Sequence, residues 1–175
     1  MRFLPTDFAD AVLIEPVPAA DARGRFERSF CAQEFEAAGL ETSFVQHSQS
    51  WSATRGTLRG MHFQRWPYGE IKLVRCLRGR VWDVIIDLRR ASPTFLHWQG
   101  FELSSGNRNQ LYVPEGFAHG FQTLSDDVEV SYMMSAPYVP DSACGVRHDD
   151  PAFDIQWPLP ISAISSKDRN WRDFA

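Results

Sequence analysis

Between residues 72 and 134 the chain alternates short apolar segments with turns that contain Pro or Gly. The segments are brief and rich in Val, Ile and aromatic residues, which predicts strands rather than helices. Many short strands at this spacing are typical of a β-sandwich or barrel, and here of a jelly roll. We predict two strands within residues 72–89, on either side of Gly79, and further strands at 95–103, 109–113, 118–124 and 128–134.

The rest of the chain carries fewer signals. Before residue 45 the one helix candidate is Ala32–Ala38, which ends before Gly39, a residue suited to a helix C-terminus. The Pro-rich tail after residue 150 is expected to wrap the barrel and to end in a short helix. No repeat or linker divides the sequence, so we expect residues 1–175 to form a single all-β domain with a few short flanking helices.

Charge and hydropathy exclude two classes of partner. Lys plus Arg is 18 and Asp plus Glu is 22, which gives a formal charge of −4. This acidic excess argues against a nucleic-acid-binding face. No apolar run approaches the ~20 residues that cross a bilayer, and the N-terminus lacks the apolar core of a signal peptide. We therefore expect neither nucleic acid nor membrane as a partner.

The three cysteines, Cys31, Cys76 and Cys144, are odd in number and far apart. None has the CxxC or Cys/His spacing of a zinc site. Free thiols are typical of a reducing compartment, so a cytoplasmic location is expected.

Residues 57–79 form a segment suited to strands in which we single out three cationic or titratable groups, Arg59, His62 and Lys72. Strand alternation alone would point Arg59 and His62 to opposite faces, because they are three residues apart. Gly60 between them could form a bulge that reverses this. By itself, a histidine such as His62 in a β-protein is more often a structural residue than a catalytic one.

Pro114, Gly116 and His119 form a P-x-G-x-x-H pattern that resembles the second cupin motif. Metal-binding cupins take H-x-H and a Glu from the first motif. Here that motif reads His62-Phe63-Gln64 followed by Glu70, so Gln replaces the middle histidine. We expect no bound metal, although His62, Glu70 and His119 keep a metal site open as an alternative.

Two further segments contain polar groups suited to proton transfer. Tyr132 and Tyr138 lie at the end of a predicted strand and in the Pro-rich turn after it. A tyrosine hydroxyl at a barrel mouth can donate a proton, and its ordinary pKa is about 10. Lys167 and Asp168 are adjacent near the C-terminus. By themselves they indicate only an ordinary pair of solvated charged residues.

Taken together, these segments resemble the dTDP-4-dehydrorhamnose 3,5-epimerase family of cupins over nearly the whole chain. Each motif alone is weak, but their order and spacing are specific. The matching motifs are D-x-R-G-x-F at Asp21–Phe26, F-V-Q with a following Ser at Phe44–Ser50, L-R-G-x-H-x-Q at Leu58–Gln64, K-L-V-R at Lys72–Arg75, S-P-T-F at Ser92–Phe95, P-E-G-F-A-H-G-F at Pro114–Phe121, G-V-R-x-D-D-P at Gly145–Pro151 and S-x-K-D at Ser165–Asp168.

The resemblance implies a cupin-type jelly roll that epimerises nucleoside-diphosphate 4-keto-6-deoxyhexoses at C3, C5 or both. A 4-ketone acidifies both neighbouring carbons, so the reaction needs a base, an acid on the opposite face and a group that holds the enolate oxygen. His62 matches the base, Asp168 the carboxylate that orients it, Tyr132 the acid and Lys72 the cation beside the oxyanion. No metal or redox cofactor is required.

The resemblance also implies a nucleotide-sugar site and a homodimer that exchanges N-terminal strands, so that part of each site comes from the partner. Arginine suits the diphosphate because its planar guanidinium donates paired hydrogen bonds. The residues that match substrate-binding or site-lining positions are Arg23, Phe26, Gln46, Arg59, His119, Tyr138 and Lys167.

The chain departs from the family pattern at several positions, some of them on the nucleotide side of the site. The family usually has Glu at Arg28, an acid at His47, Asn at Ser48, Gln-Gly at Glu70-Ile71 and Glu at Ala143. We therefore expect the epimerase chemistry to be retained while the nucleotide or sugar differs. The alternatives are a related cupin keto-sugar isomerase, a metal-dependent cupin enzyme and a non-catalytic sugar-binding cupin.

Overall fold

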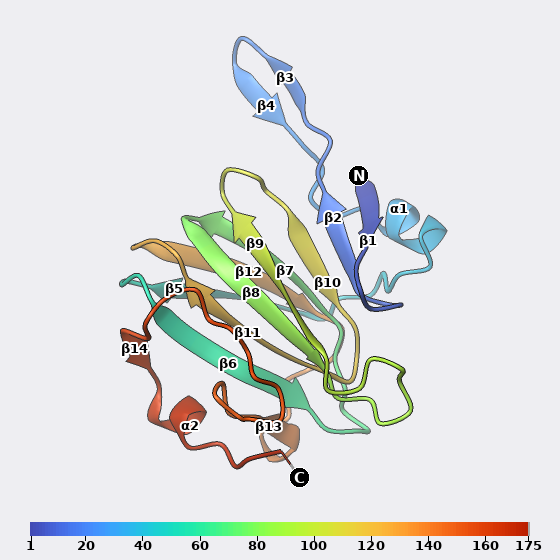
Figure 1. Cartoon of the computed structure of the whole chain (residues 1–175). Helices are drawn as coiled ribbons and strands as arrows, with labels where there is room; N and C mark the ends of the chain where they lie inside the picture. Colours follow the sequence, from blue (N-terminus) through green and yellow to red (C-terminus); the bar gives the residue numbers. More distant parts are fainter. Residues whose placement is uncertain (175) are drawn as a thin grey trace.

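The computed structural model of the protein describes residues 1–174, which form two packed β-sheets and an extra hairpin (Figure 1). The first sheet has the strand order β1 (Arg2–Pro5), β2 (Val12–Glu15), β10 (Gln110–Val113), β7 (Lys72–Arg78), β12 (Val128–Met134) and β5 (Gln46–Ser52). The second has the order β13 (Ala143–Gly145), β6 (Thr57–Gln64), β11 (Phe117–Thr123), β8 (Arg80–Asp87) and β9 (Trp98–Ser104). Strand β14 (Ala163–Ile164) also pairs with β6, outside this order. The predicted all-β class is confirmed.

The main core lies between the two sheets. It contains Val74 of β7, Ile85 of β8, Leu111 of β10 and Phe121 of β11, each at most 1% exposed. A second apolar cluster covers the outer face of the second sheet, where Val84 and Ile86 meet residues of the C-terminal segment. Strand β8 is therefore buried on both faces, which explains its continuous apolar run from Val84 to Ile86.

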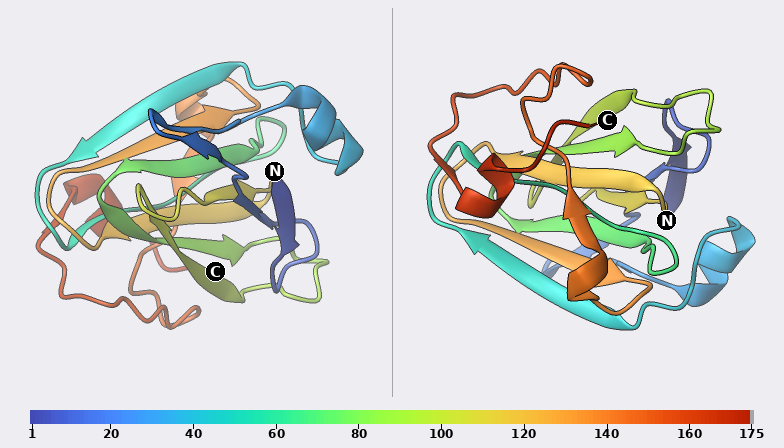
Figure 2. Two further views of the ribbon diagram at one scale, coloured as in Figure 1. Left: turned by 90° about the horizontal axis from the view of Figure 1, so that it is seen from above. Right: turned by 90° about the horizontal axis from the view of Figure 1, so that it is seen from below.

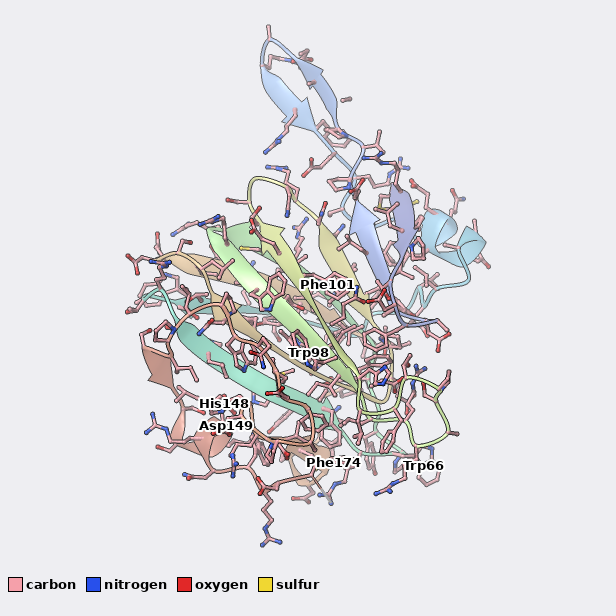
Figure 3. The ribbon with its side chains drawn as sticks, viewed as in Figure 1. Trp66, Trp98, Phe101, His148, Asp149 and Phe174 are labelled. Atoms are coloured by element: carbon pink, nitrogen blue, oxygen red, sulfur yellow. The ribbon has the colours of Figure 1, made fainter. Side chains whose placement is uncertain are left out.

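The residues of strand β9 are divided between the same two clusters, and Figure 3 labels two of them, Trp98 and Phe101. Phe101 packs against the main core, and Trp98, an odd number of residues away, packs against the outer cluster. The predicted strand at 95–103 begins three residues late, because Leu96 has a left-handed φ of 67° and its N–H donates to the carbonyl of Asp87. Residues 95–97 thus belong to a turn.

The N-terminal region contains four strands that the sequence did not predict. Helix α1 (Ala32–Ala37) is confirmed and buries Phe35 against Ile14 of β2. Strands β3 (Ala19–Asp21) and β4 (Gly24–Phe26) form a hairpin that projects away from both sheets (Figure 1). All six of its strand residues are exposed, so no apolar periodicity marks the hairpin in the sequence.

The C-terminal segment runs across the outer face of the second sheet, as expected from its composition (Figure 2). Strand β14 pairs in parallel with β6, and helix α2 (Ser166–Arg169) follows it. The main-chain N–H of Phe174 donates to the buried carboxylate of Asp150, which ties down the end of the segment. Residues 1–174 contain no helix long and apolar enough to span a membrane.

Candidate active site

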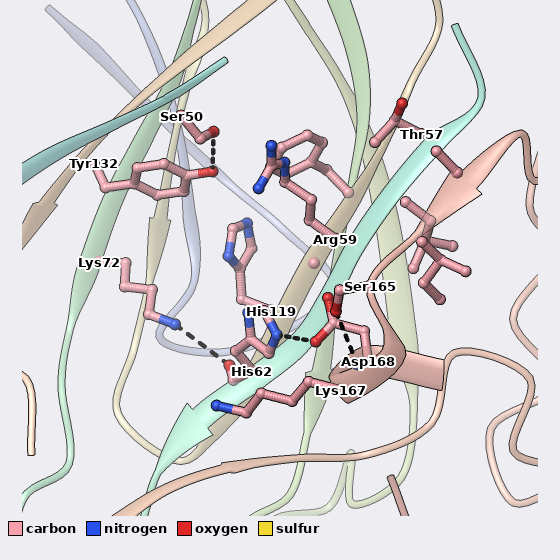
Figure 4. A pocket seen from close by; sticks show the side chains of 15 residues that line it. Ser50, Thr57, Arg59, His62, Lys72, His119, Tyr132, Ser165, Lys167 and Asp168 are labelled. Carbon is pink, nitrogen blue, oxygen red and sulfur yellow. Dashed lines mark hydrogen bonds and ion pairs between the residues drawn. The ribbon is translucent and has the colours of Figure 1, made fainter. Parts of the chain in front are cut away.

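A cavity of about 530 Å³ opens between the two sheets and is closed on one side by the C-terminal segment (Figure 4). Its polar lining comes from β5, β6, β7, β11, β12 and α2 with the residue before it. The polar side chains that line it are Ser50, Thr57, Arg59, His62, Lys72, His119, Tyr132, Ser165, Lys167 and Asp168. All four predicted catalytic residues are therefore brought together, as are the predicted binding residues Arg59, His119 and Lys167.

His62 and Asp168 form a close hydrogen-bonded pair at one end of this cavity. The Nε2–H of His62 donates to Oδ1 of Asp168 at 2.6 Å. The His62 side chain is 44% exposed, whereas that of Asp168 is 7% exposed. With Nε2 engaged, Nδ1 of His62 carries the lone pair that can accept a proton.

Hydrogen bonds keep the Asp168 carboxylate charged although it is buried. Burial raises its pKa, but the bonds from His62 and from the N–H of Gly60 outweigh burial and hold the pKa below its ordinary value. Ser165 accepts a hydrogen bond from the N–H of Asp168 at 3.0 Å and so caps α2. The charged carboxylate is thus fixed where it can orient His62.

A bulge in β6 places Arg59 and His62 on the same cavity. His62 pairs with His119 and Arg59 pairs with Phe121, so three steps along β6 oppose two steps along β11. The extra residue is accommodated at Gly60, whose φ is +133°. A Cβ on Gly60 would lie 2.5 Å from Cα of Gly120, so only glycine fits there. The predicted bulge at Gly60 is confirmed.

The Lys72 ammonium lies between the two sheets at the start of β7. Its Nζ donates to the main-chain carbonyl of His62 at 3.3 Å and lies 3.2 Å from Oε1 of Glu70. Both charged side chains are 11% exposed. The cation is therefore next to the His62 backbone and largely shielded from solvent.

Tyr132 lines the cavity at the end opposite the His62–Asp168 pair (Figure 4). Its hydroxyl forms a 2.9 Å hydrogen bond with the hydroxyl of Ser50 on β5. Burial raises the pKa of Tyr132, and the bond to Ser50 offsets this only in part. The phenol is therefore neutral at physiological pH and can act as a proton donor.

His119 forms a second histidine–carboxylate pair, deeper in the barrel. Its Nε2–H donates to the carboxylate of Asp83 at 3.0 Å, and Asp83 is fully buried. The His119 ring also contacts the ring of Tyr132, with centroids 6.4 Å apart. No role was predicted from the sequence for Asp83 or for Ser50, which was noted only as part of a motif, because the partners of both residues come from other strands.

Two cationic side chains complete the rim. Arg59 donates to the Trp51 carbonyl and to Ser52, which holds its guanidinium beside β5. Lys167 extends from α2, with its Nζ 5.3 Å from the centroid of the Trp171 ring. Both lie on the cavity lining, where they can contact an anionic group of a ligand.

The other predicted binding residues lie outside this cavity. Arg23 and Phe26 belong to the projecting hairpin, where Arg23 pairs with Asp21 and Phe26 is 77% exposed. Gln46 and Tyr138 lie next to each other, because the N–H of Tyr138 donates to Oε1 of Gln46. Within one copy of the chain, neither pair is part of the cavity lining.

The three residues of the alternative metal site, His62, Glu70 and His119, each have another partner. Nε2 of His62 is bonded to Asp168, that of His119 to Asp83, and Glu70 pairs with Lys72. Residues 1–174 contain no group of three His, Cys, Asp or Glu side chains that could hold a metal ion. Gln64, at the position of the missing motif histidine, instead donates to the carbonyls of residues 68 and 137.

The remaining departures from the family pattern lie on several elements. Arg28 pairs with Glu34 at 2.6 Å near α1. His47 and Ser48 are exposed on the edge strand β5, where Ser48 pairs with Tyr132 of β12, and Ala143 begins β13. The cavity thus holds one base with its carboxylate, one phenol and one shielded ammonium, a set that can remove a proton from carbon and return it from another side.

Comparisons with known proteins show the family and the fold of the chain. The sequence profile described as dTDP-4-dehydrorhamnose 3,5-epimerase matches residues 5–175. The enzyme of that name from Methanothermobacter thermautotrophicus is 46% identical over 175 residues, which cover 98% of this chain and 93% of the relative. The crystal structure of the Bacillus anthracis enzyme with TDP and PPi bound has a TM-score of 0.96 and 42% identity, and the match covers 99% of both chains.

A structure with a narrower activity is also similar. ChmJ, a 3'-monoepimerase from Streptomyces bikiniensis in complex with dTDP-quinovose, has a TM-score of 0.90 and 33% identity, and the match covers 97% of this chain and 86% of ChmJ. These neighbours confirm the expected cupin-like jelly roll. The chain belongs to the dTDP-4-dehydrorhamnose 3,5-epimerase family.

Proposed function

We propose that this chain epimerises a nucleoside-diphosphate 4-keto-6-deoxyhexose, of the dTDP-4-dehydro-6-deoxyglucose kind, in deoxysugar (rhamnose-type) biosynthesis. The observation that carries the proposal is the joint presence of His62, Tyr132 and Lys72 on one cavity in a member of this family. A binding protein would need the shape of the cavity but not an acid and a base at its two ends.

The reaction begins at a carbon next to the 4-ketone. His62 takes the proton through Nδ1, the C–H electron pair forms a carbon–carbon double bond, and the carbonyl electrons move to the oxygen. Asp168 stabilises the imidazolium through the 2.6 Å bond at Nε2. Lys72 stabilises the enolate oxygen, where preorganised charge contributes most to catalysis. Tyr132 then donates its proton to the carbon from the opposite face, which inverts the centre.

The cations on the cavity lining fit the diphosphate of such a substrate. Arg59 and Lys167 come from two different segments and leave donors free for phosphate oxygens. His119, fixed by Asp83, lines the cavity between the base and the acid. We assign these three residues to substrate binding, next to the four proposed catalytic residues.

A homodimer would complete the site with residues that a single copy leaves outside. The hairpin β3–β4 projects from the body and exposes Arg23 and the Phe26 ring. We propose that it reaches the site of a second copy, where Arg23 would meet phosphate and Phe26 the nucleoside, near Gln46 and Tyr138. Light scattering gives the oligomeric state, and Phe26→Ala should weaken nucleotide binding without unfolding either copy. A monomeric enzyme with unchanged affinity would contradict this arrangement.

Two further features fit the same proposal. We propose that the whole chain is one domain, because β1 and β2 join the sheet of β10 while the C-terminal β14 pairs with β6.

All three cysteines are free thiols, which fits a reducing compartment and supports a cytoplasmic enzyme.

Deuterium incorporation from D2O tests the function directly. The enzyme is incubated with dTDP-, CDP-, UDP- and GDP-linked 4-keto-6-deoxyglucose, and deuterium at C3 and C5 is followed by NMR. Exchange at one or both carbons identifies the epimerised centre, and the relative rates identify the nucleotide. No exchange at either carbon with any of the four substrates would contradict the epimerase proposal.

A further inference from the structure

Glu70 is the acidic partner of the cation that we place at the enolate oxygen. Its Oε1 lies 3.2 Å from Nζ of Lys72, and both side chains are 11% exposed. Charges shielded in this way are screened less by water and salt than a surface pair. The carboxylate of Glu70 is therefore a close and little-screened counter-charge for the ammonium of Lys72.

The ammonium is held from two sides of the barrel. Glu70 precedes β7 in the first sheet, while the carbonyl oxygen of His62, 3.3 Å from Nζ, belongs to β6 in the second sheet. A lysine side chain has four rotatable carbon bonds and loses considerable rotamer freedom when it is fixed. Two partners on different sheets confine Nζ to the gap between them, beside the backbone of the proposed base.

Glu70 itself is not among the residues that line the cavity in the described part of the chain, whereas Lys72 is. A bound substrate would therefore meet the ammonium, with the carboxylate behind it. Any effect of Glu70 on the reaction would pass through Lys72. This separates Glu70 from Arg59 and Lys167, which line the cavity themselves.

We propose that Glu70 is a positioning residue that fixes the Lys72 ammonium where negative charge develops on the substrate oxygen. The inference rests on the proposed function and names a residue beyond its four proposed catalytic groups. A shielded ammonium without its counter-charge is disfavoured. Removal of Glu70 should therefore make the charged Lys72 side chain less stable at this position. Because the interaction grows with the charge on the oxygen, its loss falls on kcat more than on KM.

A double-mutant cycle tests this coupling. We expect Glu70→Gln to lower the rate of deuterium exchange about tenfold and to change KM less than about threefold. In a Lys72→Gln background the same substitution should change the exchange rate by less than about twofold, because the group it acts through is gone. Mass spectrometry after long incubation keeps the slow exchange of the double variant measurable.

Two more variants separate positioning from folding. Glu70→Asp keeps the carboxylate and should retain more than about half of the wild-type exchange rate. Glu102→Gln removes one partner of the exposed Arg80–Glu102 pair on β8 and β9, whose closest atoms are 3.9 Å apart, and should leave exchange unchanged. Melting temperatures of all variants show whether a loss of rate reflects unfolding.

The outcomes distinguish this inference from the function on which it rests. An equal loss from Glu70→Gln in both backgrounds, a loss confined to KM, or a Glu70→Asp rate as low as that of Glu70→Gln would overturn the positioning role. An active wild-type enzyme with a silent Glu70→Gln variant would overturn it as well and leave the epimerase function standing. Absence of exchange in the wild-type enzyme would overturn the proposed function itself.

Discussion

Nε2 of His62 lies 2.6 Å from Oδ1 of Asp168, although 106 positions separate the two residues in the chain. The imidazole comes from β6 in the second sheet, and the carboxylate comes from α2 in the C-terminal segment. Parallel pairing of β14 with β6 brings the segment across the sheet just before α2 begins. The proposed base thus depends on the docking of a tail that contributes little to the sheets.

Replacement of His62 by Ala should abolish proton abstraction while binding persists. We expect the deuterium-exchange rate to fall by about 10³-fold, within the range for loss of a general base. Nucleotide affinity, measured by calorimetry, should stay within about threefold, because the base acts mainly in the transition state. Replacement of His97, which is exposed outside the cavity, by Ala serves as the control and should leave both quantities unchanged. An equal loss from both variants would contradict the role of His62.

Asp168→Asn should show the value of the charge behind His62. The amide keeps the size of the side chain but neither stabilises an imidazolium nor accepts as strongly from Nε2. We expect kcat to fall by about 10²-fold or more, with a smaller change in KM. Asp141→Asn, at an exposed position, is the matched control and should leave kcat unchanged. A kcat within threefold of wild type would show that His62 needs no charged partner.

Tyr132→Phe should separate the two halves of the reaction. The variant loses the acid on the opposite face but keeps His62, so exchange with solvent should survive better than inversion. We expect the ratio of epimerised product to exchanged substrate, measured by NMR, to fall by about tenfold or more. Tyr68→Phe, at a half-exposed tyrosine outside the cavity, should leave the ratio unchanged. Equal, mild losses of exchange and inversion would mean that the acid and base are misassigned.

Gly60→Ala should disturb both stability and the site. The new Cβ would meet Cα of Gly120 at 2.5 Å, and the φ of +133° disfavours any L side chain. We expect a loss of about 3 kcal/mol in the free energy of unfolding, measured with urea, together with reduced exchange because Arg59 and His62 shift. Gly106→Ala is the control, because its Cβ would make only an ordinary 3.6 Å contact. Equal stabilities of the two variants would contradict the packing argument.

The buried carboxylate of Asp87 should make stability depend on acid pH. Burial raises its pKa, but hydrogen bonds from Arg89, Ser92 and Thr94 outweigh this and lower the pKa from 3.8 to about 2. A depressed pKa stabilises the fold above pH ~4, and this stabilisation, about 2 kcal/mol, is lost as the pH falls toward 2. Asp87→Asn should therefore destabilise the protein at pH 7 and much less at pH 2.5, as measured by urea unfolding. An equal difference in the free energy of unfolding between wild type and variant at both pH values would contradict this pH dependence.

The strands from β7 to β12 could be predicted, because burial on one or both faces leaves an apolar pattern in segments such as 80–87 and 128–134. Strands β1, β2, β5, β13 and β14 of the same sheets were not predicted. The hairpin at residues 19–26 could not be predicted, since its side chains are exposed and no pattern marks them. Ser50 and Asp83 were missed for a related reason. A serine or aspartate in a strand has no local sign of its partner, and the partners Tyr132 and His119 come from other strands.

The sequence by itself determined the strands from β7 to β12 and the supply of acid, base and cationic groups, and the family resemblance implied that Asp168 orients His62. The tertiary structure decided the bulge at Gly60 and how the groups are brought together. His62 and His119 lie opposite each other on β6 and β11, yet His62 takes Asp168 from the C-terminal segment and His119 takes Asp83 from β8. The physical reason is that strand periodicity sets which face a side chain occupies. Which distant carboxylate reaches that face depends on sheet order and on the path of the tail, which local sequence does not encode.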